Sequence, residues 1–147
     1  MEDTGHSVPE LFAERGEAAF RAEEERVLTE ALRHALEGDQ PVVVSVAGGA
    51  VLRPDNRALL RASGTVVWLR ARVSTLARRV GDGAGRPLLG DDPAAALAGL
   101  SEVRRPLYEE VATSVIDVDD LGPDEVADRL VALMVPIAAA AEGRARA

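Results

Sequence analysis

The stretch Pro41–Val51, PVVVSVAGGAV, constrains the fold of this chain more than any other. Its valines are β-branched and favour a strand over a helix. Because the run is continuously apolar rather than alternating, it predicts a strand covered on both faces, as in a parallel sheet between layers of helices. We therefore expect a strand over Val42–Val46, with Gly48 and Gly49 just beyond its carboxyl end.

The position of Gly48 and Gly49 leaves two interpretations open. Open α/β sheets bind ligands at the carboxyl edge of their strands, and glycines there let a ligand approach the backbone N–H groups closely. A tight turn that needs glycine for its backbone freedom accounts for the local pattern better when the pair is considered alone. The other features of the chain favour the ligand site.

Helical and strand patterns alternate along the chain, which predicts the α/β class with a parallel sheet flanked by helices. The predicted strands cover 42–46, 65–69 and 114–118, and the predicted helices cover 7–15, 17–36, 54–60, 73–80, 93–111 and 124–141. Arg15-Gly16 separates the first two helices, and Asp92 caps the helix that begins at Pro93. We expect one domain over residues 1–141 and a disordered tail over 142–147.

Composition excludes several classes of function. With 47% hydrophobic residues, the 147-residue chain has enough apolar material for one packed core. The formal net charge of −8 argues against nucleic acid as the main partner. No apolar run approaches the roughly 18 residues of a membrane span. The absence of cysteine excludes thiolate metal sites and fits a reducing cytoplasm. The two histidines have no partner at metal-ligand spacing, so we predict no metal site.

All 17 basic residues are arginines, and three of them stand out. Arg21 precedes an acidic run and could bind an anion or form an ion pair within its helix. Arg86 lies in the glycine-rich segment 81–92, which could close over a ligand or be an ordinary surface loop. Arg104 precedes Pro106 inside a helical pattern, where proline predicts a kink or a helix end. A guanidinium suits phosphate or carboxylate because its fork donates two parallel hydrogen bonds.

The order and spacing of these features resemble the shikimate kinase family, from the N-terminus to about Leu133. The matching pieces are Thr4-Gly5-His6-Ser7-Val8-Pro9-Glu10-Leu11-Phe12, Gly16-Glu17-Ala18-Ala19-Phe20-Arg21, Val46-Ala47-Gly48-Gly49-Ala50-Val51, Arg86-Pro87-Leu88-Leu89 and Arg104-Arg105-Pro106-Leu107-Tyr108. The resemblance implies a P-loop kinase-like fold that transfers the γ-phosphate of ATP to the 3-hydroxyl of shikimate with Mg²⁺, in aromatic amino acid biosynthesis.

The resemblance also implies roles for individual residues. On the substrate side, Arg21 and Arg104 would bind the shikimate carboxylate, and Gly48 and Gly49 would meet the ring edge through backbone N–H groups. On the ATP side, Arg86 would be the lid arginine that reaches the transferring phosphate, and Arg79 would stack on adenine. Phosphoryl transfer depends mainly on positioning and charge neutralisation, which arginines and backbone donors supply.

Several parts of the family pattern are missing from this sequence. It contains no G-x-x-x-x-G-K-[ST] motif and no lysine. By the resemblance, the central first strand, the P-loop and the second strand with its Asp-x-Asp pair would precede Met1. The first strand would lie between those at Val42–Val46 and Val66–Leu69, whose backbone groups would then lack a neighbour. Ala47 replaces the first glycine of the family's triple, and Leu121 stands where many members have a basic residue.

We therefore expect an N-terminally truncated shikimate kinase-like chain that is inactive as written, and we hypothesise a start codon placed too late. The alternative is a degenerate, non-catalytic domain that binds shikimate or regulates, and a third possibility is a remnant that does not fold alone. A gluconate kinase-like enzyme is the rival within the P-loop kinases. The resemblance implies a monomer, and exposed strand edges would allow this chain to associate. It also implies shikimate as a small-molecule partner, with no nucleic acid and no membrane.

Overall fold

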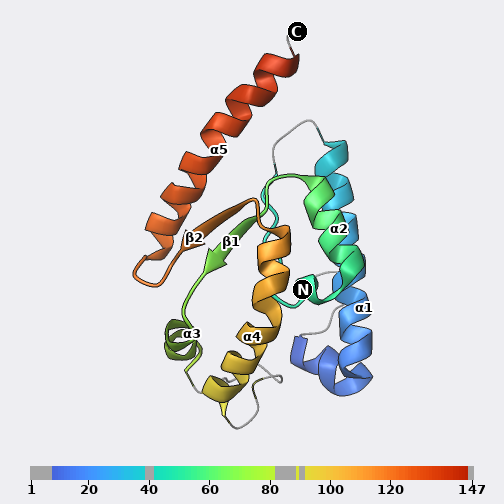
Figure 1. Ribbon diagram of the computed structural model, residues 1–147. Coiled ribbons are helices and arrows are strands. Elements are labelled where there is room, and N and C mark those ends of the chain that lie inside the picture. The colour runs from blue at the N-terminus through green and yellow to red at the C-terminus, as the bar shows by residue number, and fades with distance from the viewer. Residues whose placement is uncertain (1–7, 39–41, 82–88, 90–91, 146–147) are drawn as a thin grey trace.

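The computed structural model describes residues 8–38, 42–81, 89 and 92–145 (Figure 1). In chain order its elements are α1 (Val8–Glu37), the 3₁₀ helix η1 (Ala50–Leu52), α2 (Pro54–Ser63), β1 (Val67–Arg70), α3 (Val73–Val80), α4 (Pro93–Val111), β2 (Ser114–Asp117) and α5 (Pro123–Ala145). The alternation of helices and strands from α2 onward follows the predicted α/β pattern.

β1 and β2 form a parallel pair, as predicted for these two segments. The register runs from Val67 opposite Ser114 to Arg70 opposite Asp117. The pair begins with a side-chain bond, because the Thr113 hydroxyl accepts a 2.7 Å hydrogen bond from the Val66 N–H. Two parallel strands need a long crossover connection, and α3 and α4 supply it.

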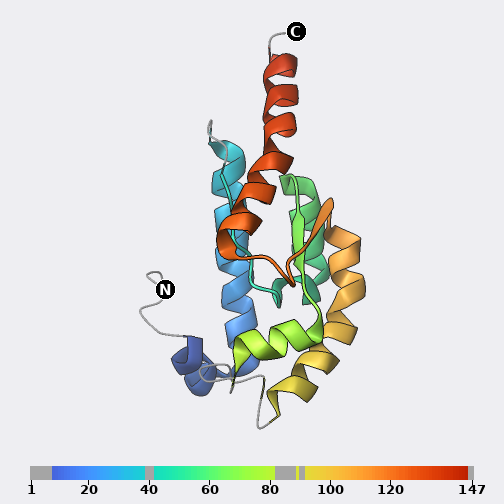
Figure 2. The ribbon, with the colours of Figure 1, turned by 90° about the vertical axis from the view of Figure 1, so that its left-hand side faces the viewer.

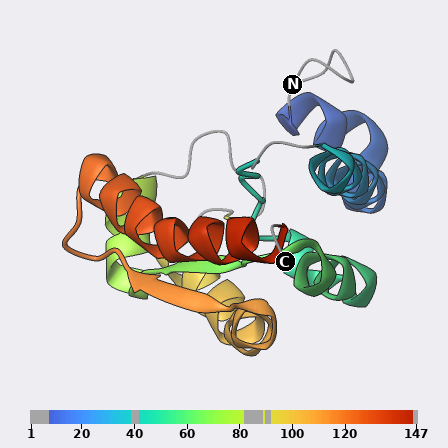
Figure 3. The ribbon, with the colours of Figure 1, turned by 90° about the horizontal axis from the view of Figure 1, so that it is seen from above.

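The helices lie on different sides of this small sheet. α1 and α2 run side by side, and Figure 3 shows them grouped away from the two strands. α5 projects beyond the other described elements, as the view in Figure 2 makes clear. Within the ranges that the structure describes, no helix is both long and apolar enough to cross a membrane.

The main apolar cluster lies where α1, α2, η1 and α4 meet, beside the glycine pair. Its buried members are Leu28, Leu32, Ala50, Val51, Leu60 and Val111. Val44, Leu59, Val66, Leu107 and Tyr108 pack against it while remaining partly exposed. The cluster therefore fixes the segment that follows the glycines against three helices.

The strand predicted over Val42–Val46 is wrong. The segment has no regular secondary structure, and no described strand pairs with it. Val43 is 73% exposed and Val42 is 54% exposed, so the segment is not covered on both faces. A strand is stable only when its backbone groups pair with a neighbouring chain, which the described residues do not provide here. Among these valines, Val44 is the one that packs against the core.

Smaller differences concern where helices end. Gly16 breaks α1 as predicted, with φ 76° and ψ 174°. α4 runs from Pro93 to Val111 as predicted, so Pro106 does not end the helix, and Val111 at its last position is buried in the core. α5 continues to Ala145 and so includes residues predicted to be a disordered tail. The reason is that alanine, glutamate and arginine are strong helix formers, and they outweigh the single glycine in this stretch.

Two valines test the correction at Val42–Val46. We expect Val111→Ala to lower the free energy of unfolding by about 2 kcal/mol, because it removes two buried methyl groups and leaves a cavity. Val43→Ala should change it by less than about 0.5 kcal/mol, because Val43 is exposed. Urea unfolding followed by circular dichroism measures both. Equal losses would mean that Val43 is buried after all.

Candidate functional site

The candidate site centres on the short turn formed by Gly48, Gly49 and η1. The Ala50 N–H donates to the Ala47 carbonyl at 3.0 Å, and the Leu52 N–H donates to the Gly49 carbonyl at 3.1 Å. Among the described residues, neither glycine of the pair has a positive φ, and Ala47 has none either. Glycine is therefore not needed here for its backbone freedom, and alanine in place of the first glycine is unstrained.

Space, rather than dihedral freedom, explains the two glycines. A Cβ atom on Gly49 would overlap the guanidinium of Arg21, whose Cζ would lie 3.0 Å away. A Cβ atom on Gly48 would lie 2.7 Å from the Tyr108 hydroxyl and 3.9 Å from Nη1 of Arg104. The structure thus brings Arg21 and Arg104 onto consecutive residues of one turn, although they are far apart in the sequence.

Helical spacing explains how α1 delivers its arginine to this turn. Arg21, Leu28 and Leu32 are separated by seven and four residues, so they share one face of the helix. The two leucines are buried in the core, and the arginine extends the same face to the glycines. On α4, Arg104 and Val111 share a face in the same way.

Arg21 also forms the ion pair that the sequence suggested as the alternative to an anion site. Its guanidinium bonds to the Glu24 carboxylate, and the two side chains are only 14% and 16% exposed. The pair holds the Arg21 head close to Gly49 instead of letting it extend into solvent. The ion-pair interpretation is therefore confirmed, and the same guanidinium also lies against the glycine turn.

Arg104 carries a donor that no described residue uses. Its Nε is buried and has no hydrogen-bond partner among the described residues. A buried donor without a partner costs free energy, so it is poised to bond an acceptor that enters the site. Arg105, the next residue on α4, is exposed.

Two residues that the sequence did not single out hold η1 in place. Asn56, which is 2% exposed, donates from its side-chain amide to the Ala50 carbonyl at 3.0 Å. Arg57 donates to the Val51 carbonyl at 2.9 Å and pairs with Glu110 of α4 at 2.8 Å. Polar residues in the first turn of a helix are common for capping, so no local signal distinguishes this role.

Tyr108 is a third residue that holds the turn. Its hydroxyl donates a 2.8 Å hydrogen bond to the Gly48 carbonyl, and its ring stacks on Trp68 with centroids 5.3 Å apart. The sequence did show one signal for it, because Tyr108 follows Arg104 by four residues and so lies on the same side of α4.

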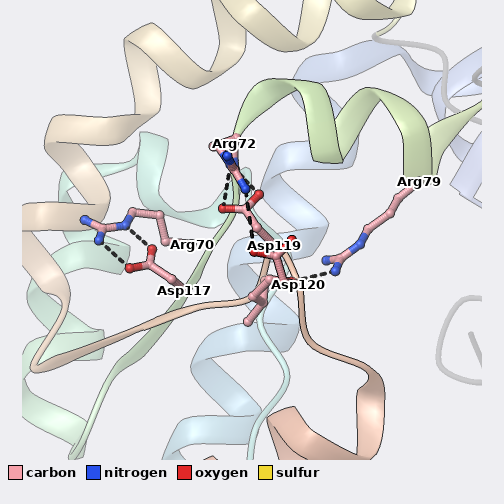
Figure 4. Close-up of polar contacts among 7 residues, drawn as sticks. Arg70, Arg72, Arg79, Asp117, Asp119 and Asp120 are labelled. Atoms are coloured by element: carbon pink, nitrogen blue, oxygen red, sulfur yellow. Dashed lines mark hydrogen bonds and ion pairs between the residues drawn. The ribbon is translucent and has the colours of Figure 1, made fainter.

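A second cluster of charged side chains lies where β1 and β2 end (Figure 4). Arg70 and Asp117, which are opposite each other in the register, form a two-bond ion pair at 2.6 and 2.8 Å. The hydrogen bond from Arg70, together with its charge, lowers the pKa of the Asp117 carboxyl, and the same contact raises the pKa of Arg70.

Asp119 anchors the start of α3 to the loop after β2. Its carboxylate accepts hydrogen bonds from the Thr75 hydroxyl and, at 2.9 Å, from the Arg72 N–H. These two bonds, in that order, lower the pKa of Asp119 below its ordinary value. Its side chain is 13% exposed, whereas that of Asp120 is 90% exposed.

Arg79 lies at the same end of the sheet, on the last turn of α3. It donates to the Val118 carbonyl at 2.6 Å and to the Leu121 carbonyl at 3.4 Å, and Figure 4 shows it reaching across to the loop after β2. Arg86 lies outside the described residues. Within the described ranges, no group of three His, Cys, Asp or Glu side chains could hold a metal ion.

The lowered pKa of Asp119 predicts a pH dependence of stability. The folded-state pKa lies below the ordinary value of 3.8, so the ionised carboxylate stabilises the fold above that pH, and the contribution is lost as the pH falls through the folded-state pKa. We expect Asp119→Asn to be less stable than the wild type at pH 7 and the difference to shrink toward pH 3. Urea midpoints measured between pH 3 and pH 7 give this difference.

Asp120→Asn is the matched control for this prediction, because Asp120 is the next residue and its side chain is exposed. It should follow the wild type at every pH. A difference between Asp119→Asn and the wild type that stayed constant with pH would contradict the assignment.

Comparison with known proteins connects this site to a family. The family model for shikimate kinase matches residues 1–135. Curated relatives include the shikimate kinase of Frankia casuarinae, 45% identical over 92% of this chain and 57% of its own length, and that of Thioalkalivibrio sulfidiphilus, 43% identical over 79% of this chain and 59% of its own. The chain therefore spans less than two thirds of the length of these relatives.

Solved structures agree with the sequence comparison. Shikimate kinase from Acinetobacter baumannii, in complex with shikimate, aligns with a TM-score of 0.80 and 32% identity over 90% of this chain and 72% of its own. Shikimate kinase from Bacteroides thetaiotaomicron aligns with a TM-score of 0.71 and 29% identity over 89% of this chain and 74% of its own. Since the family model covers most of the sequence and the fold aligns with both structures, the chain belongs to the shikimate kinase family.

Proposed function

We propose that this chain is the shikimate-binding part of an ATP-dependent kinase that phosphorylates the 3-hydroxyl of shikimate, in aromatic amino acid biosynthesis. One observation carries the proposal: Arg21 and Arg104, from two different helices, converge on the turn at Gly48 and Gly49. The A. baumannii relative in complex with shikimate supports this choice of ligand.

Shikimate offers a carboxylate and hydroxyl groups, and the site offers donors for both. Arg104 would bind the carboxylate, because its buried Nε has no partner among the described residues. Arg21 would bind the same carboxylate, with Glu24 holding its guanidinium in position. The backbone N–H groups of Gly48 and Gly49 would donate to the ring hydroxyls, which can approach the backbone because neither residue carries a side chain of its own.

The ATP side of the site involves two further arginines. We propose that Arg79 stacks on adenine and that Arg86, which lies outside the described residues, reaches the transferring phosphate. The residues in hand do not fit Mg²⁺ or the phosphate chain, because the sequence has no G-x-x-x-x-G-K-[ST] motif and the described part has no metal-ligand cluster. We therefore propose that these 147 residues do not transfer phosphate by themselves.

The same proposal extends to the domain boundaries, the cellular compartment and the partner of this chain. We propose that residues 1–141 form one domain and that it works in the cytoplasm, where ATP is supplied. Its partner would be shikimate rather than nucleic acid or a membrane, because a net charge of −8 repels phosphate backbones. The alternative is a non-catalytic domain that retains shikimate binding but does not respond to ATP.

Adjacent arginines on α4 provide the test of the shikimate site. We expect Arg104→Gln to weaken shikimate binding about tenfold or more, because a charge-assisted bond to the carboxylate is lost. Arg105→Gln is the matched control and should bind as the wild type does, since Arg105 is exposed. Isothermal titration of each purified chain with shikimate gives the dissociation constants.

Two further results would distinguish the substrate assignment from the claim about the phosphate site. A wild-type chain that shows no saturable binding of shikimate would contradict the substrate assignment. Thermal unfolding with ATP and Mg²⁺ tests whether the chain has a phosphate site, because a ligand that binds only the folded state raises the midpoint of unfolding. A clear rise with ATP would contradict the claim that these residues lack a working phosphate site.

The exposed valines predict association of the 147-residue chain. We propose that the chain is a monomer where the segment Val42–Val46 is covered. Where it is not, two chains would associate through this segment, because exposed apolar backbone without a pairing partner attracts other strands. Val43→Lys should reduce concentration-dependent association in sedimentation velocity. Val131→Lys is the control, since Val131 is 60% exposed but lies on α5. A wild-type chain that stays monomeric at every concentration would contradict the proposal.

A further inference from the structure

The hydrogen bond between Tyr108 and Gly48 orients a peptide group of the glycine turn. The Tyr108 hydroxyl donates to the Gly48 carbonyl oxygen at 2.8 Å. That oxygen and the Gly49 N–H belong to one peptide group, and the described part of the chain contains no cis peptide bond. In a planar trans peptide the C=O and N–H point in opposite directions. Holding the Gly48 oxygen therefore also sets the direction of the Gly49 N–H.

The same bond sets the distance between the glycines and Arg104. Tyr108 and Arg104 are four residues apart on α4, so their side chains lie one above the other. Both reach Gly48, where an added Cβ would lie 2.7 Å from the hydroxyl and 3.9 Å from Nη1 of Arg104. Tyr108 thus holds the N–H groups of the glycine turn at a fixed position relative to the Arg104 guanidinium.

Two features of α4 bear on this hydrogen bond: the Tyr108 ring is held in place, and the helix beside it is weakened. The Tyr108 ring stacks on Trp68 at an interplanar angle of 29°, which fixes the ring to β1. Between Arg104 and Tyr108 lies Pro106, which has no N–H and removes one hydrogen bond from the helix. The hydroxyl bond restrains α4 near the turn where the helix is weakened.

We propose that Tyr108 is a positioning residue for shikimate, which acts by fixing the Gly49 N–H relative to Arg104. This inference rests on the proposed function, since it concerns the same ligand. Tyr108 does not touch shikimate in this scheme. Its hydroxyl acts only through the backbone of Gly48, while its ring contributes to packing.

The variant that isolates the hydroxyl is Tyr108→Phe, which keeps the ring on Trp68. We expect its dissociation constant for shikimate to rise about fivefold, because one hydrogen bond that orders the site is lost. The thermal midpoint without ligand should change little, and this separation of affinity from stability distinguishes positioning from packing. Isothermal titration and thermal unfolding are both measured on the 147-residue chain.

Ser63→Ala is the matched control. The Ser63 hydroxyl donates to the Leu59 carbonyl at 2.7 Å, so the variant also removes a hydroxyl-to-carbonyl bond, but at the end of α2. Its affinity for shikimate should equal that of the wild type. Equal affinities of the wild type and Tyr108→Phe would overturn the inference and leave the proposed function standing.

A second substitution tests the contact itself. Gly48→Ala should lower the thermal midpoint, because the new methyl group meets the Tyr108 hydroxyl. In the Tyr108→Phe background the same change should cost much less, since the next nearest ring atom lies 3.9 Å away. Additive effects would overturn the inference. A wild-type chain without saturable shikimate binding would overturn the proposed function and this inference with it.

Discussion

The close approach of side chains to the two glycines is the contact on which the rest of the site depends. The guanidinium of Arg21 occupies the space that a side chain on Gly49 would fill, and the Tyr108 hydroxyl does the same at Gly48. α1 and α4 can reach the turn only because these positions lack a Cβ. The core beneath them then holds both helices, since Leu28 of α1 and Val111 of α4 are buried in the same cluster.

The turn is held mainly by side-chain donors from the helices around it. Asn56, Arg57 and Tyr108 each donate to a different carbonyl of the segment from Gly48 to Leu52. Such bonds replace the ladder of a sheet, and none of them uses the backbone N–H groups of the two glycines. A site that is ordered before its ligand arrives loses less entropy on binding.

β1 connects this turn to the charged cluster at the end of the sheet. Trp68 and Arg70 are two residues apart, so they lie on the same face of the strand, and the Arg70 guanidinium lies 5.6 Å from the centre of a Trp68 ring. Trp68 stacks on Tyr108, while Arg70 pairs with Asp117 of β2. One face of a four-residue strand thus contacts both regions in which we place ligands.

The sequence by itself determined the helices, the break at Gly16, the parallel pairing class and the family, because periodicity, capping and motif order are local properties. It also suggested Arg21, Arg104 and the two glycines as a group, through the resemblance. Only the tertiary structure decided that the glycines are there for space and that the valines of 42–46 are exposed. Both facts depend on which distant chain segment lies alongside, and apolarity or small size alone does not specify that neighbour.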